Sequence, residues 1–172
     1  MLAGSENKTE NGLKGLLPFI TTLFFILLTQ LQYKMYFLEN IFPFLSLAAV
    51  YYWGIFKPRL MPVSAVFFLG LLQDILSGGP LGLMALLLMI VRLFVLRQGS
   101  RFLEREFLFN WLVFILASFV FGAALWAISS IYLKETQVIW NMLGQSLLTI
   151  AIFPLVVWFL GWVRHFLVTE NR

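Results

Sequence analysis

The sequence predicts an all-α polytopic membrane protein, a bundle of six transmembrane helices with both termini in the cytoplasm. Three observations predict it: an apolar composition, six long apolar windows, and a one-sided distribution of basic residues. Of the 172 residues, 61% are hydrophobic and 12% are charged, and the mean hydropathy is +0.92. A spanning helix takes about 20 apolar residues, so six spans leave little chain for a soluble domain.

The apolar windows fix the expected helices in order. They fall at residues 13–33, 41–56, 60–77, 81–96, 107–133 and 138–163, within a transmembrane domain of residues 13–163. Residues 1–12 and 164–172 are expected to be cytoplasmic tails. The second window is short and ends in Tyr51, Tyr52 and Trp53. Aromatic residues of this kind sit at the headgroup level and can complete a short span.

The orientation follows from the twelve Lys and Arg residues, because cytoplasmic loops retain excess positive charge. Lys34 and Lys134 fall on one side, and Arg92 lies inside the fourth window. All the others fall on the opposite side, which is therefore expected to be cytoplasmic: Lys8, Lys14, Lys57, Arg59, Arg97, Arg101, Arg105, Arg164 and Arg172. This placement also accounts for the net charge of +4 without nucleic acid.

The inventory of reactive residues argues against an enzyme. The chain has no cysteine, its one histidine, His165, lies beside Arg164 at the expected cytoplasmic end, and Asp74 is its one aspartate. The glutamates all fall in tails or connections. General acid–base catalysis within a membrane needs a histidine, paired carboxylates or a metal ion. We therefore expect no catalytic residues, no metal site and no cofactor.

Asp74 is the most informative residue, because an ionisable group in a transmembrane segment is costly and needs a partner or a role. It lies about a turn and a half below the expected periplasmic surface, near Gly78 and Pro80. Its carboxylate could fold back onto the free N–H groups at the start of the fourth helix. A contact with a partner protein and a proton or ion site are the alternatives.

Arg92 lies one helix later, and two interpretations remain open for it. One is an ion pair with Asp74, which a depth difference near 10 Å disfavours at 1.5 Å per residue. The other, which we prefer, is that Arg92 extends toward the cytoplasmic phosphates together with Arg97, Arg101 and Arg105. This basic cluster would bind anionic lipids or, as the alternative, a partner protein.

Two further patterns concern packing and polarity. Ser118 and Gly122, and Ala123 and Ala127, are spaced four apart in the fifth window and predict close helix approach, within the chain or to a partner. Polar residues also gather toward the expected periplasmic end, which favours either a cleft or docking surface there or an ordinary polar rim. They are Thr29, Gln30, Gln32, Asp74, Ser77, Asn141 and Gln145.

The hairpin between the third and fourth windows reads G-L-L-Q-D-I-L-S-G-G-P-L-G-L over residues 70–83. It resembles the signature region of the bacterial rod shape-determining protein MreD family, and the six windows and short connections extend the resemblance over nearly the whole chain. The positions that carry it are Gly70, Asp74, Gly78, Pro80, Gly82 and Leu83.

The resemblance implies a non-enzymatic inner-membrane scaffold of the cell-elongation machinery that regulates peptidoglycan synthesis. It implies direct binding of MreC through the transmembrane helices, and indirect connection to MreB, RodA and its penicillin-binding transpeptidase. The family is also considered similar to substrate-binding subunits of energy-coupling-factor transporters. The alternative function is therefore a small-molecule-binding membrane subunit of a transporter.

Overall fold

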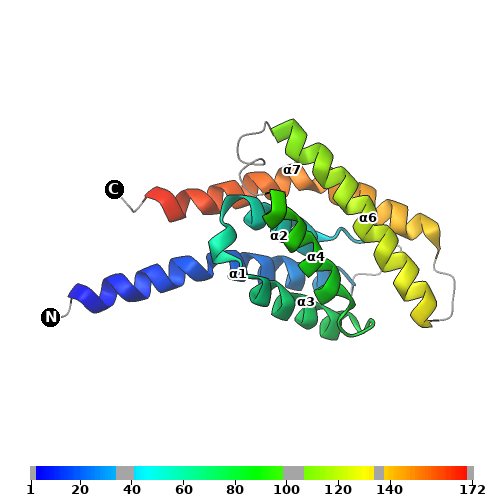
Figure 1. Cartoon of the computed structure of the whole chain (residues 1–172), viewed down its shortest axis with the longest axis horizontal. Helices are drawn as coiled ribbons and strands as arrows, with labels where there is room; N and C mark the ends of the chain where they lie inside the picture. Colours follow the sequence, from blue (N-terminus) through cyan, green and yellow to red (C-terminus); the bar gives the residue numbers. More distant parts are fainter. Residues whose placement is uncertain (1–2, 34–40, 99–106, 134–137, 170–172) are drawn as a thin grey trace.

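The chain folds into α-helices in the order in which the apolar windows occur. A computed structural model describes residues 3–33, 41–98, 107–133 and 138–169, and in this part it contains six α-helices, a short 3-10 helix and no strand (Figure 1). The all-α prediction is confirmed. The helices are α1 (Ala3–Tyr33), α2 (Leu45–Phe56), α3 (Val63–Ser77), α4 (Leu83–Gln98), α6 (Phe107–Leu133) and α7 (Ile139–Thr169), with η1 (Pro58–Leu60) between α2 and α3.

The helices differ in how well their lengths suit a membrane. Two apolar stretches, Phe107–Tyr132 in α6 and Ile139–His165 in α7, are long enough to span a bilayer. The apolar stretches Gly15–Gln30, Leu45–Phe56 and Val63–Ser77 are shorter. Six helices thus match six predicted windows in position, whereas clear spanning length is found in two of the helices described.

The ends of α1 and α7 extend past the predicted spans. Helix α1 begins at Ala3 instead of residue 13, and α7 continues to Thr169 instead of ending at residue 163. Apolarity marks only the part of a helix that suits lipid, while backbone hydrogen bonds also form along polar sequence. The start of α1 and the end of α7 lie at the same end of the bundle, and the α3–α4 turn lies toward the other (Figure 1).

Helix α2 forms the centre of the bundle. Every residue from Leu45 to Ile55 is buried, and α1, α4 and α7 pack around the helix. A helix that is apolar on all sides is stable where other helices surround it. Helix α2 thus has almost no face left for lipid.

The prediction that the aromatic residues at the end of this window lie at the headgroup level is wrong. Tyr51, Tyr52 and Trp53 are at most 2% exposed. The indole Nε1 of Trp53 donates to the Thr21 hydroxyl at 3.0 Å, and the Tyr51 hydroxyl donates to the Asn110 carbonyl at 3.1 Å. Their polar atoms find these partners inside the protein, so the rings can fill its core.

Helices α3 and α4 form a closely packed hairpin. A Cβ atom on Gly70 would lie 2.7 Å from the backbone nitrogen of Ala85 and closer still to its Cα, which no real Cβ tolerates. In the turn, Gly78 and Gly82 have φ values of +69° and +90°, a region that favours glycine. Glycine at these positions therefore permits both the turn and the close approach.

We predict that Gly70→Ala destabilises the protein by about 1–3 kcal/mol, because the added methyl group forces the α3 and α4 backbones apart. Gly79→Ala is the control: that position has no positive φ, and its Cβ would meet only the Ser77 hydroxyl at 3.7 Å. Unfolding of the reconstituted variants by denaturant titration measures the difference. Equal midpoints for the two variants would contradict the close contact.

Candidate functional site

Asp74 joins the end of α3 to the start of α4. It lies on the buried face of α3, together with Val66, Leu69, Gly70 and Gln73, and it is 2% exposed. Its Oδ2 accepts hydrogen bonds from the backbone N–H groups of Gly82 at 2.9 Å and Ala85 at 3.3 Å, and its Oδ1 accepts from that of Met84 at 3.0 Å. The first N–H groups of a helix have no partner within the helix, so the carboxylate supplies one.

These contacts are the ones expected of a carboxylate that folds back onto the next helix. The partial positive charge at a helix start adds to their strength. Both carboxylate oxygens are engaged with backbone groups, which favours a structural role for Asp74 over a proton or ion site. The turn residues Gly78 and Pro80 lie between the two helices that the carboxylate joins.

The structure corrects the placement of Arg92. Its side chain is 1% exposed, its Nε donates to the Met61 carbonyl at 2.8 Å, and its Nη2 donates to the Pro58 carbonyl at 2.7 Å. The residue therefore does not extend to lipid phosphates, and these two hydrogen bonds go to backbone carbonyls and not to Asp74. The reason is its place in α4: Leu88, Arg92 and Val95 share the buried face, which directs the side chain inward.

In the predicted basic cluster, Arg97 does lie at the surface, in the last turn of α4. It is exposed, as a lipid or partner contact requires. Arg101 and Arg105 lie outside the described residues. The cluster is thus reduced to Arg97 in the described part of the chain, and Arg92 belongs to the interior.

The small residues of α6 divide between two environments. Ser118 is fully buried, and a Cβ on Gly122 would lie 2.5 Å from the Ser146 hydroxyl oxygen of α7. This pair therefore serves packing within the chain. Ala123 is exposed and Ala127 is half-buried, so they lie outside this contact.

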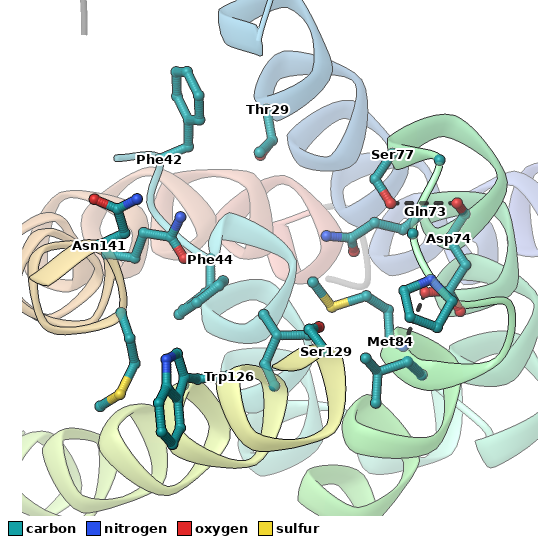
Figure 2. A pocket seen from close by; sticks show the side chains of 18 of the residues that line it. Thr29, Phe42, Phe44, Gln73, Asp74, Ser77, Met84, Trp126, Ser129 and Asn141 are labelled. Carbon is teal, nitrogen blue, oxygen red and sulfur yellow. Dashed lines mark hydrogen bonds between the residues drawn. The ribbon is translucent and has the colours of Figure 1, made fainter. Parts of the chain in front are cut away.

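A cleft of about 440 Å³ opens at the end of the bundle that holds the α3–α4 turn (Figure 2). It collects six of the seven polar residues expected near that end, and the side chain of the seventh, Gln32, lies outside the described part. The aromatic residues of its wall are Phe42, Phe44, Trp126 and Tyr132. Its polar lining residues are Thr29, Gln30, Gln73, Asp74, Ser77, Ser129, Asn141 and Gln145.

Gln73 and Ser129 are the polar cleft residues that sequence reasoning missed, and Gln73 is the more deeply buried of the two. It is 5% exposed and extends from α3 toward the open centre of the cleft (Figure 2). Its Oε1 is buried without a hydrogen-bond partner among the described residues. The signal was present in the sequence, because Val66, Leu69, Gly70 and Gln73 follow the spacing of one helix face.

We predict that Asp74→Asn lowers the free energy of unfolding by about 2 kcal/mol, the scale of hydrogen bonds to a charged group. The amide NH₂ would replace an acceptor and face backbone N–H donors. Ser77→Ala is the control, because the Ser77 hydroxyl donates only within the last turn of α3, to the Asp74 carbonyl at 3.3 Å. Denaturant titration compares the two, and an unchanged midpoint for Asp74→Asn would refute the role of the carboxylate in holding the hairpin.

We predict that Arg92→Met also lowers the free energy of unfolding by about 2 kcal/mol, because the Pro58 and Met61 carbonyls lose charged donors. Arg97→Met, at an exposed position on the same helix, is expected to change it by less than about 0.5 kcal/mol. The same titration applies. If Arg97→Met proves the more destabilising of the two, the assignment of the buried contact is wrong.

Comparison with known proteins places these features in a family. One curated relative is an uncharacterized protein of Rickettsia prowazekii (strain Madrid E), RP566, which is 30% identical over 117 residues. That match covers 66% of this chain and 66% of the relative, slightly less than two thirds of its length. No solved structure matches the chain.

The family comparison covers far more of the sequence. Residues 10–167 match the family described as rod shape-determining protein MreD, and this range contains the glycines of the α3–α4 hairpin, the carboxylate that joins its helices, and the cleft beside it. The family consists of non-enzymatic membrane proteins with a role in determining rod shape. The chain therefore belongs to the rod shape-determining protein MreD family.

Proposed function

We propose that this chain is a non-enzymatic scaffold of the bacterial cell-elongation machinery in the inner membrane and that it binds MreC directly. Membership of the MreD family is the observation that carries the proposal. In the proposed arrangement all six helices cross the membrane and both termini are cytoplasmic. The start of α1 and the end of α7 lie at one end of the bundle, which supports an even number of crossings (Figure 1).

The outer face of α6 is the surface that we propose for MreC. Ser118 and Gly122 cannot serve, because α7 already packs against that side of the helix. Ala123 is exposed, and Leu116 and Val120 beside it are 66% and 61% exposed. A small residue among larger apolar ones lets a second helix approach closely within a membrane.

Other partners would be reached less directly. In this proposal MreB, RodA and its penicillin-binding transpeptidase connect to the chain through MreC or through weak contacts. Arg97 lies at the end of α4, where an exposed cation would contact anionic lipid headgroups. These lipids would fix the position of the scaffold without specifying a protein partner.

We predict that Ala123→Phe reduces co-purification with co-expressed MreC several-fold, because the larger ring prevents close helix approach. Ala151→Phe is the matched control, since Ala151 is also an exposed alanine on a long apolar helix, α7. Quantitative affinity capture from the membrane measures the ratio. Equal recovery of MreC with both variants would remove this face of α6 from the proposal.

A small-molecule-binding membrane subunit of a transporter is the second candidate. The cleft of about 440 Å³ is the observation that favours it, because small-molecule sites commonly have volumes of roughly 300–1,000 Å³. A bound ligand would also be compatible with a scaffold. Recovery of the protein with an ATPase module, instead of MreC, would favour the transporter.

A further inference from the structure

Gln73 lines the cleft and has a buried amide oxygen whose partner is missing from the described part of the chain. Gln73 lies next to Asp74 in sequence. Unlike the Asp74 carboxylate, its amide makes no hydrogen bond to a turn or a helix end in the described part of the chain. Its Oε1 is buried and without a hydrogen bond there. Leaving such an acceptor unsatisfied costs about 1–3 kcal/mol, so a donor in the cleft toward which the amide turns would stabilise it.

The wall of the cleft restricts the charge of that donor. Among the described residues that line it, none is Lys, Arg, His or Glu, and the Asp74 carboxylate is already engaged by three backbone N–H groups. A charged ligand would therefore receive no counter-charge from the described residues of this partly buried site, which is costly. The wall offers amides, hydroxyls and aromatic rings, so an uncharged ligand fits it best.

The arrangement of these groups indicates the shape of the ligand. Trp126 from α6 and Phe44 from the segment before α2 contribute rings, while Gln73 and Asn141 contribute amides from other sides (Figure 2). Rings bind the apolar face of a molecule, and amides bind groups that both donate and accept hydrogen bonds. A pyranose ring has such an apolar face and a rim of hydroxyl groups.

We propose that the cleft binds an uncharged sugar and that the Gln73 amide hydrogen-bonds to it. The sugar would be either free or the headgroup of a glycolipid, since both present the same chemistry. The proposal uses the cleft of the second candidate function but requires no transport. It is also independent of MreC binding, because the proposed docking surface lies on the outer face of α6.

The test uses the full chain in phosphatidylcholine nanodiscs and saturation-transfer NMR. The probes are N-acetylglucosamine, which is neutral and carries hydroxyls and an amide, and the charged sugars glucosamine and glucuronate. A second set of nanodiscs contains glucosyl diacylglycerol and is titrated with N-acetylglucosamine as a competitor. Binding of the free probe in phosphatidylcholine alone indicates a free sugar as the source. Protection against thermal unfolding by the glycolipid alone indicates a headgroup.

Gln73→Leu is expected to weaken binding at least fivefold, with unfolding at the same or a higher temperature, because leucine removes the unsatisfied amide. If Gln73 had only a structural role, the Gln73→Leu variant would instead unfold at a lower temperature. Gln98→Leu, at the far end of α4 and outside the cleft, is the control and should bind like the parent. Failure of both neutral probes, tighter binding of a charged sugar, or undiminished binding by Gln73→Leu would each overturn the proposal, whatever the result with MreC.

Discussion

Where helices end, backbone N–H and C=O groups have no partner within the helix and need one inside this protein. Two buried charged side chains are such partners. Asp74 accepts from N–H groups at the start of α4, and Arg92 donates to carbonyl groups beside η1. A membrane interior offers no water to do the same. The negative charge of Asp74 is thus bound by N–H donors, and the positive charge of Arg92 by carbonyl acceptors. Because each charge has backbone partners of its own, the two residues need not pair with each other.

Much of the fold could be predicted because apolarity along the chain reports helix positions directly. The six windows coincide with six helices, and the sequence around Asp74 contained both a helix start with free N–H groups and the glycines that form the turn. The close contact of Gly70 with the Ala85 backbone then holds α3 near enough for the carboxylate to reach α4. The prediction succeeded here because every interacting group lies within one short stretch of chain.

Contacts between distant parts of the chain could not be predicted in this way. Helix α2 is apolar on all sides, so its pattern does not distinguish a lipid-facing side from a buried one, and Trp53 was placed at the membrane surface when its partner is Thr21. Arg92 was expected at the surface because its carbonyl partners lie in the connection around η1, two elements earlier. Gln73 was overlooked because the cleft it faces is assembled from five helices and the segment before α2.

The enclosure of α2 has a consequence for how the protein is made. Part of its surroundings comes from α7, far downstream: the Phe44 N–H donates to the Thr149 hydroxyl at 2.8 Å, and the Tyr51 and Phe153 rings lie 5.9 Å apart. In the proposed arrangement, in which all six helices cross the membrane, α2 is synthesised long before α7 and has one side uncovered until α7 is made. The final environment of α2 is therefore completed by a helix synthesised later, so in this arrangement the short, apolar α2 must stay in place without that cover until α7 is made.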